Sequence, residues 1–277
     1  MPLEVLIIDN NSNNGFRTEP YFKEFSRLSI VRIVMETNQG LTPARLRGIQ
    51  EAKGDVLVFV DDDNILKQDF FRQGNRIAEE CTHIGAWGGK IVLTCEKEPE
   101  PWAFPYLGLL AKRDIDKDYW SNLPALGESM PCGAGMFVRK EVAEYYYQLH
   151  KAGKRSIQLD RKGGSLFSGG DDDLATCACD IGLGVGVFHK IELNHYIPAS
   201  RLTKEYLLKL AREIAASSIV LNSYRDKKPQ KRSFKNKLAD QIRLLLKSPM
   251  DRKFYSAVLR GQDQGMAILD SQILKKG

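Results

Sequence analysis

The sequence predicts an α/β domain built on an open, largely parallel sheet and followed by a basic helical extension. Short apolar runs rich in β-branched residues alternate with helix-like segments over the first two hundred residues, a pattern typical of α/β sheets. Several runs end in carboxylates, at the edge of the sheet where such folds bind ligands. Residues from Arg201 onward hold 18 basic and 7 acidic side chains, whereas the preceding residues hold 23 and 28. We therefore expect a folded domain over residues 1–224 and a basic extension over 225–277.

The composition is that of a globular protein. Hydrophobic residues are 43% and charged residues 27% of the 277, with a net charge of +6, which excludes a disordered, collagen-like or coiled-coil chain. No apolar run approaches the ~18 residues that a membrane-spanning helix needs, and the segment from Met1 to Gly15 has no signal-peptide pattern. Five cysteines are too few and too odd for a disulfide framework, which favours a reducing, cytoplasmic setting.

The first elements follow from local sequence patterns. Three apolar runs are predicted strands, namely Leu3–Asp9, Ile30–Glu36 and Asp55–Val60. Thr42 and Pro43 follow a turn, so we expect a helix with Thr42 as its N-cap that stops at Gly54. A further helix is predicted over Gln68–Cys81.

The later elements are predicted in the same way. The expected strands are Ile84–Thr94, Cys132–Val138 and Val185–Leu193, the last leading to His195, and the expected helices are Glu141–His150, 172–180, Leu202–Tyr224, Phe234–Lys247 and Asp251–Leu259. Thr203 is the expected N-cap of the long helix. Residues 99–126 are expected to form loops and short helices over one face.

Asp61, Asp62 and Asp63 form the sharpest chemical feature. Three carboxylates at the end of a strand repel one another unless a cation, hydrogen bonds or water offset the repulsion. A hard ion such as Mg²⁺ or Mn²⁺, bridged to a diphosphate, is a natural partner. The alternative is a solvated turn in which Asp63 or Asn64 caps the next helix.

A second acidic cluster, Asp171 to Asp173, follows a glycine-rich loop. One of these carboxylates could cap the following helix and the others favour its N-terminal dipole. The alternative function is a general base that removes a proton from an attacking hydroxyl. His195, which alone is more often structural, could complete a mixed oxygen and nitrogen metal site with Asp63.

The order and spacing of these segments resemble the family 2 glycosyltransferases, which have the nucleotide-sugar-binding GT-A fold, a mixed sheet flanked by helices. The resemblance runs from Leu3 to about Leu202, and its close looks like that of a bacterial subgroup that makes surface polysaccharides. The matching stretches are EVLIIDNNSNNG, NQGLTPARLRGIQEAKGDVLVFVDDDN, GAGMFVRKEVA and GGDDDLATCACDIGLGVGVFHKIELNHYIPASRL.

The resemblance implies which residues bind the nucleotide-diphosphate sugar. Asp9 matches the acid that contacts the base. Asn38, Gly40 and Arg45 match the segment beside the diphosphate and ribose. Gly133 and Gly135 match the strand beside the donor sugar and the acceptor.

The resemblance also implies a metal site and a base. Asp61, Asp62 and Asp63 match the DxD-type motif, in which Asp63 would be the first metal ligand and Asp61 the second. His195 matches a position that can approach the metal or diphosphate. The catalytic base falls on Asp171, with Asp172 as the alternative because the alignment could shift by one residue.

The implied reaction is direct displacement with inversion at the anomeric carbon. Mg²⁺ or Mn²⁺ would stabilise the nucleoside diphosphate leaving group, and the base would deprotonate a hydroxyl of a glycan or lipid-linked acceptor. In the family another strand and helix precede the strand matched by Leu3–Asp9. This preceding strand lies in the middle of the family's sheet, between two neighbouring strands. We expect its two neighbours to have unpaired backbone groups here.

Two other functions remain open at this point. A catalytically inactive or truncated GT-A-like binding module would fit the absence of the usual first strand. A nucleotidyltransferase on a related sheet would need a glycine-rich, basic signature near its first strand, and this sequence shows none.

The basic extension has two interpretations. Basic residues precede the apolar stripe LADQIRLLL, namely Lys227, Lys228, Lys231, Arg232, Lys235 and Lys237. This pattern fits a helix lying on anionic lipid at the inner face of the membrane, and the alternative that we favour slightly is a solvated helix that packs its apolar face on the domain. Aromatic residues are sparse in the extension, which argues against nucleic acid as the partner.

Overall fold

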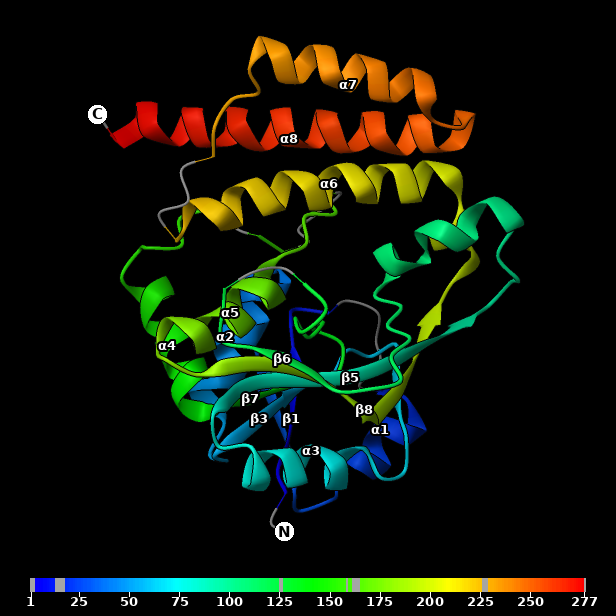
Figure 1. Cartoon of the computed structure of the whole chain (residues 1–277). Helices are drawn as coiled ribbons and strands as arrows, with labels where there is room; N and C mark the ends of the chain where they lie inside the picture. The colour runs from blue at the N-terminus through cyan, green and yellow to red at the C-terminus, as the bar shows by residue number, and fades with distance from the viewer. Residues whose placement is uncertain are drawn as a thin grey trace.

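The computed structural model describes residues 3–12, 18–124, 127–157, 159–160, 165–225 and 229–276. A mixed sheet lies at its centre (Figure 1), with strand order β3-β7-β5-β8-β4 and β6 paired to β8. Its strands are β3 (Val56–Phe59), β4 (Asn64–Leu66), β5 (Ile84–Cys95), β6 (Tyr119–Ser121), β7 (Met136–Arg139) and β8 (Gly184–Ile197). Only β5 and β8 pair in parallel, and the other pairings are antiparallel. The expectation of a largely parallel sheet is therefore wrong for this sheet.

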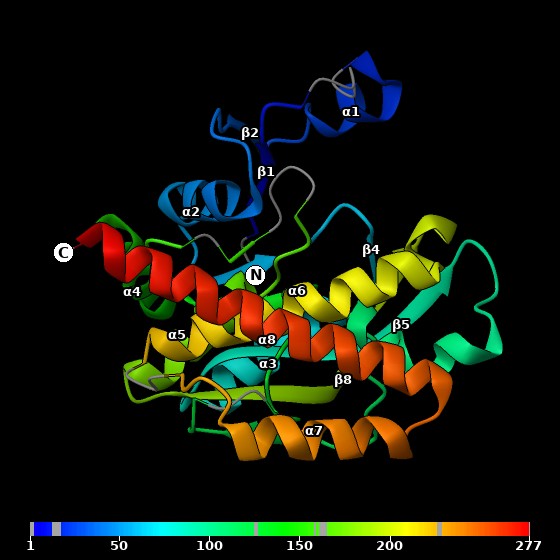
Figure 2. The ribbon, with the colours of Figure 1, turned by 90° about the horizontal axis from the view of Figure 1, so that it is seen from above.

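A smaller two-stranded sheet lies to one side of the main sheet (Figure 2). It consists of parallel strands β1 (Val5–Asp9) and β2 (Val31–Met35), and it carries helices α1 (Pro20–Phe25) and α2 (Leu41–Glu51). Within the described residues, β1 pairs only with β2, and β3 pairs only with β7. Glu4 ties the two parts together because its Oε1 accepts the backbone N–H groups of Lys53 and Gly54, at 2.5 and 3.1 Å.

Helices cover both faces of the main sheet. Helix α2 with α4 (Lys140–Lys151) and α5 (Gly170–Asp180) packs on one face, and α3 (Phe70–Glu80) packs on the other. On the α3 face the Phe137 ring stacks on Trp87 at 5.5 Å and on Phe70 at 5.1 Å between centroids. Gly74 allows this packing, because a Cβ there would lie 2.0 Å from the Phe137 ring.

Further helices form a stack on one side of the sheet (Figure 1). They are α6 (Lys204–Ser223), α8 (Pro249–Lys276) and α7 (Phe234–Leu246). Two shorter helices, η2 (Pro101–Leu110) and η3 (Ala199–Leu202), pack beside α6. Thr203 caps α6 as predicted, since its side chain accepts the Tyr206 N–H at 3.3 Å. Helix α8 lies close against α6, and a Cβ at Gly261 would stand 2.1 Å from the Arg212 carbonyl oxygen. No helix in the described part of the chain is long and apolar enough to cross a bilayer.

Three local expectations are corrected by the structure. Gly40, with φ of 133°, holds the N-cap position of α2 in place of Thr42, which lies inside the helix. Residues 64–66 form strand β4 instead of a cap for the next helix, and His195 lies within β8 opposite Asn64. The common cause of these differences is that long-range strand pairing and side-chain hydrogen bonds outweigh the local turn signals.

The extension also differs from the expected packing. Helix α7 turns its apolar side chains outward: Phe234 is 82% exposed and Leu246 is 83% exposed. The interpretation that this helix packs its apolar face on the domain is therefore wrong. Lys227 and Lys228 of the predicted basic segment lie outside the described residues.

Candidate active site

Asp63 and His195 meet where β4 pairs with the end of β8. The register of that pair places His195 opposite Asn64, so Asp63 Oδ2 lies 3.4 Å from His195 Nε2. Arg201, on η3, donates from Nη1 to the same Asp63 oxygen at 3.0 Å. Burial alone would raise the pKa of Asp63, but the bonds and charges of His195 and Arg201 hold that pKa below its ordinary value.

The His195 imidazole is oriented for a metal ion. Its Nδ1 lies 3.1 Å from the Leu110 carbonyl oxygen, which can only accept, so Nδ1 carries a proton and Nε2 is the ring nitrogen that faces Asp63. A backbone carbonyl on the far nitrogen is the usual support of a ligating histidine. Nitrogen and carboxylate donors suit Mn²⁺. His195 and Asp63 therefore fit a divalent ion as two ligands, although no group of three or more His, Cys, Asp or Glu side chains suited to a metal lies in the described chain.

Asp61 faces the same region from the end of β3. Loss of hydration within the fold raises the pKa of its carboxyl, the charge of Arg45 opposes that rise, and the charges of Asp63 and Asp171 add to it. Asp62 is exposed. Asn64 holds the turn, because its side chain accepts the Asp61 N–H at 3.2 Å and donates to Asp63 Oδ1 at 3.1 Å.

Arg45 is a buried cation directed at this acidic region. Helix α2 presents Arg45 and Thr42 on its buried face, and both side chains donate to Asp160 Oδ2, at 3.1 and 2.6 Å. Burial would lower the pKa of Arg45, but the negative charges of Asp160, Asp171 and Asp61 raise it above its ordinary value. A fixed positive charge of this kind suits a phosphate-bearing ligand.

The predicted nucleotide-binding residues gather at the carboxyl end of β1. Asp9 is 3% exposed, and its Oδ1 accepts the Ser12 N–H at 2.9 Å. Asn10 organises the opposing turn: its side chain donates to the Asn38 carbonyl at 2.7 Å and accepts the Gly40 N–H at 2.6 Å. This network holds Asn38 and Gly40 beside the β1 end, where the resemblance implied base and ribose contacts.

Asp171, in the first turn of α5, is fixed by the loop before β7. Gly133 N–H donates to Asp171 Oδ2 at 2.7 Å. The contact depends on glycine, since a Cβ at position 133 would stand 2.9 Å from the Asp171 Cβ. Gly135 has φ of 68°, and a Cβ there would meet Leu193 at 2.4 Å. These glycines thus let the β7 loop approach α5 and the sheet closely.

Asp172 has a different environment from Asp171. Burial and the neighbouring charge of Asp171 raise the pKa of Asp172 well above its ordinary value, and Arg113 only partly offsets this. Arg113 is anchored by a bond to the Met130 carbonyl at 2.9 Å and to Cys132 Sγ at 3.3 Å. A carboxyl with a raised pKa is a suitable proton acceptor. Asp172 therefore stays the alternative to Asp171 as the predicted catalytic base.

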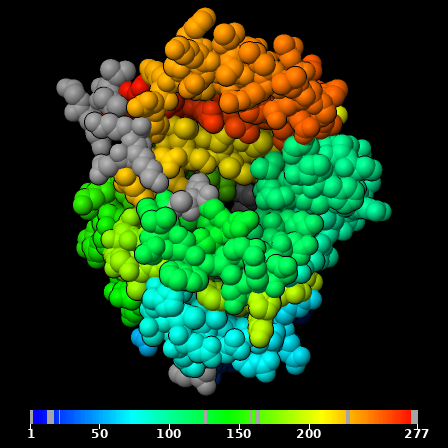
Figure 3. Space-filling view, viewed as in Figure 1, coloured from blue at the N-terminus to red at the C-terminus, as the bar shows by residue number. Residues whose placement is uncertain are grey.

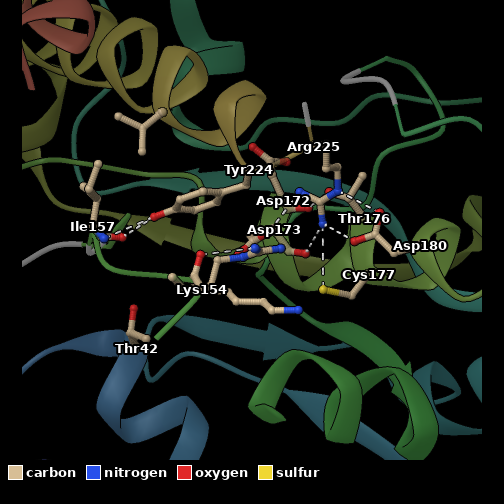
Figure 4. Close-up of polar contacts among 12 residues, drawn as sticks. Thr42, Lys154, Ile157, Asp172, Asp173, Thr176, Cys177, Asp180, Tyr224 and Arg225 are labelled. Atoms are coloured by element: carbon tan, nitrogen blue, oxygen red, sulfur yellow. Dashed lines mark hydrogen bonds and ion pairs between the residues drawn. The ribbon is translucent and has the colours of Figure 1, made fainter. Parts of the chain in front are cut away.

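Asp173 is a structural member of the cluster. It is 1% exposed, and it pairs with Arg155 at 2.7 Å and with Arg225 at 2.9 Å. Figure 4 shows Arg225 extending to Asp173, to Asp180 and toward Cys177. Asp171 and Asp172 therefore face the charged side chains of the site. Asp173 instead holds α5 to the end of α6.

Comparison with known proteins bears on this arrangement. Residues 1–146, just over half of the chain, match the model of the family described as "Glycosyl transferase family 2". The chain belongs to this family. It is also 29% identical over 84 residues to EpsH of Bacillus subtilis (strain 168), a protein named as a glycosyltransferase, a match that covers 30% of this chain and 24% of that protein.

Two solved structures resemble this family 2 chain. A mannosyltransferase, PcManGT from Pyrobaculum calidifontis, in complex with GDP-Man and Mn²⁺ aligns at a TM-score of 0.54 with 14% identity, covering 95% of this chain and 78% of that one. It shows that the family 2 chain has the GT-A fold. GalNAc-T7 with UDP, GalNAc and Mn²⁺ aligns at 0.46 with 16% identity, covering 86% of this chain and 48% of that chain.

Sequence reasoning missed several side chains of this family 2 site. Asp160 lies more than a hundred residues from the arginine it pairs with, and nothing in its local sequence marks it. Arg113 comes from a segment with weak periodicity. Arg201 was part of a quoted motif, but only the fold shows that it bonds Asp63. Asn10 was recognisable only as a turn residue.

Proposed function

We propose that the protein is an inverting, metal-dependent glycosyltransferase that moves a sugar from a nucleotide-diphosphate donor to a hydroxyl group. The observation that carries this proposal is one cluster of opposite charges. Together with Asp160, the charges of Asp171 and Asp61 raise the pKa of Arg45, and the charge of Asp171 adds to the raised pKa of Asp61, although Asp61 follows β3, Arg45 lies on α2 and Asp171 lies on α5. Family membership and the GT-A fold support the same reaction.

The chain's own residues divide the work of the reaction. Asp171, held by the Gly133 N–H, accepts the proton of the acceptor hydroxyl as that oxygen attacks the anomeric carbon. The bond from the anomeric carbon to the diphosphate breaks on the opposite side, so the configuration inverts. Asp9, Asn38 and Gly40 hold the nucleoside.

The leaving group needs positive charge, and the site offers it from two sources. Arg45 supplies a permanently charged guanidinium. Asp63 and His195 would hold Mg²⁺ or Mn²⁺, which supplies Lewis-acid stabilisation of the departing diphosphate. Asp61 would contribute as the second carboxylate. Arg201, now bonded to Asp63, keeps that carboxylate ionised at neutral pH and ready for a cation.

We place the reaction in the synthesis of bacterial surface polysaccharide, with a glycan or a lipid-linked sugar as acceptor. The motif order that resembles such enzymes supports this placement. PcManGT, which shares the fold, is in complex with GDP-Man and Mn²⁺, which supports a nucleotide-diphosphate donor and a divalent ion here.

The test is to separate donor binding from transfer. Asp171→Asn should keep nucleotide and metal affinity and lower turnover about 100- to 10,000-fold, the range for a lost general base. Nucleotide affinity is measured by calorimetry, and turnover by release of nucleoside diphosphate. If Asp171→Asn retains turnover and Asp172→Asn loses it, the base is Asp172.

A second candidate function is a binding module that holds the nucleotide without transferring sugar. The observation in its favour is the separation of the β1–β2 sheet from the main sheet within the described residues, because the nucleoside residues then stand on a different sheet from the one against which α5, with the proposed base, packs. Nucleotide binding without turnover in the wild-type chain, over a panel of donors and acceptors, would support the module.

A further inference from the structure

Helix α7 presents a continuous apolar stripe to solvent. Its members recur at helical spacing, which places them on one face, and each is 54–83% exposed: Phe234, Leu238, Ile242, Leu245 and Leu246. Soluble domains rarely leave so many large apolar side chains together in water, and patches of this kind mark interaction surfaces. Figure 1 shows α7 as the outermost helix of its stack, and Figure 3 shows it at the edge of the molecule.

The opposite side of α7 is polar, and it is the side that faces the protein. Asp240 is 5% exposed, and it accepts hydrogen bonds from Tyr255 of α8 at 2.6 Å and from Arg232 at 3.2 Å. A crevice of about 390 Å³ lies between side chains of the two helices, and its lining includes Lys237, Arg260 and Asp263. Helix α7 therefore turns its polar face to the protein and its apolar face to solvent, the opposite of a helix that packs on a core. This arrangement indicates that the apolar face binds a partner outside the chain.

The charged side chains around α7 indicate which kind of partner its apolar face binds. Residues 231–247 carry six basic side chains, Lys231, Arg232, Lys235, Lys237, Arg243 and Lys247, and a single acid, Asp240. That acid is bonded to Arg232 and Arg243, and Lys231 and Arg232 pair with Asp270 and Asp263 of α8. The positive charge beside the stripe therefore comes from Lys235 and Lys237. A second copy of this chain would bring the same positive surface to the contact and would be repelled.

We propose that α7 docks the protein on an anionic lipid bilayer, with the stripe of Phe234, Leu238, Ile242, Leu245 and Leu246 in the interface and Lys235 and Lys237 among the headgroups. An exposed apolar face beside lysines is the composition of helices that lie in the plane of a membrane surface. The helix is 13 residues long, which suits lying on the surface. This inference goes beyond sugar transfer and does not depend on it.

The test is flotation of the full chain with vesicles of phosphatidylcholine alone and with added phosphatidylglycerol. The wild-type protein should float with the anionic vesicles and stay behind with the neutral ones. Leu238→Ser with Ile242→Ser should lower the partition coefficient about 100-fold, from about tenfold for each apolar side chain withdrawn. Lys235→Gln with Lys237→Gln should lower it about fivefold per lysine, and added salt should weaken the wild-type binding.

Phe25→Ser is the matched control. Phe25 is 52% exposed, and Figures 1 and 2 place its helix, α1, on the opposite side of the molecule from α7. This variant should float like the wild type. All four proteins should melt at the same temperature, since every changed side chain is on the surface.

Three results would overturn the proposal. The first is no flotation of the wild type with anionic vesicles. The second is flotation that the Leu238→Ser, Ile242→Ser pair leaves unchanged. The third is a wild-type dimer by light scattering that this pair converts to a monomer without any effect on vesicles, which would assign the stripe to a second copy of the chain.

Discussion

Replacing Asp173 by asparagine removes a buried negative charge that joins α5 to the chain beyond α6. Asp173 is 1% exposed and pairs with Arg155 and Arg225. Arg225 keeps Asp180 at 2.8 Å, but Arg155 keeps no carboxylate within the described residues and retains the Lys154 carbonyl at 3.5 Å and its position over the Tyr224 ring at 4.5 Å. The substitution therefore leaves one buried guanidinium without a carboxylate, which is the expensive way to break a buried pair.

The expected loss of stability is about 3 kcal/mol, the lower end for breaking a buried ion pair. An unfolding entropy of about 2.1 cal/mol/K per residue, over 277 residues, gives about 0.58 kcal/mol/K. The melting temperature should then fall by about 5 °C. Urea unfolding followed by circular dichroism, together with differential scanning calorimetry, measures both quantities.

Asp172→Asn is the matched control, one residue away. Burial raises the folded-state pKa of Asp172 well above that of the unfolded chain, so its contribution to stability is full below about pH 4 and is lost as the pH rises through the folded pKa. Asparagine cannot ionise, so this variant should be at least as stable as wild type at pH 7. The difference should shrink toward pH 4. Equal losses for Asp172→Asn and Asp173→Asn at pH 7 would refute the division of roles.

Three further predictions rest on single contacts. Gly133→Ala should lower turnover about 100-fold without changing nucleotide affinity, because the new Cβ displaces Asp171. Steady-state kinetics measures the turnover and calorimetry measures the affinity. Unchanged turnover would contradict this prediction. Gly261→Val should destabilise by about 1–3 kcal/mol in urea, whereas Gly108→Ala, which meets nothing within 4 Å, should not. Arg45→Met leaves the buried Asp160 without a cationic partner in the described part of the chain, where it keeps Thr42, so it should cost about 3 kcal/mol and also weaken nucleotide binding.

Much of the fold was predictable because local pattern and tertiary structure agree in it. The runs that became β1, β2, β3 and β5 are apolar and bounded by turn residues, and the cap of α6 is a threonine in the usual position. Strand direction was not predictable. Strands β7 and β4 join the sheet in antiparallel orientation through pairs of residues far apart in the sequence, for example Leu57 with Val138. No local sequence signal marks these pairs.

The candidate site divides in the same way. The two aspartate clusters stand out because repeated carboxylates at element ends are rare and costly. Their cationic partners do not stand out, because Arg113, Arg155 and Arg225 resemble surface arginines until the fold buries them. The outward turn of the α7 stripe was also hidden, since the sequence shows that a helix has an apolar face but not which side the protein covers.

The most direct test of the account is a thermal-shift measurement on the wild type and Asp63→Ala. Each is melted with UDP, GDP, dTDP and CMP, with and without Mn²⁺. A metal-dependent donor site at Asp63 predicts that one nucleotide stabilises the wild type only with Mn²⁺, by about 2.7 kcal/mol at a hundred times its dissociation constant, and that Asp63→Ala loses this effect. No stabilisation of a cooperatively folded wild type by any of them, or equal stabilisation of Asp63→Ala, would contradict it.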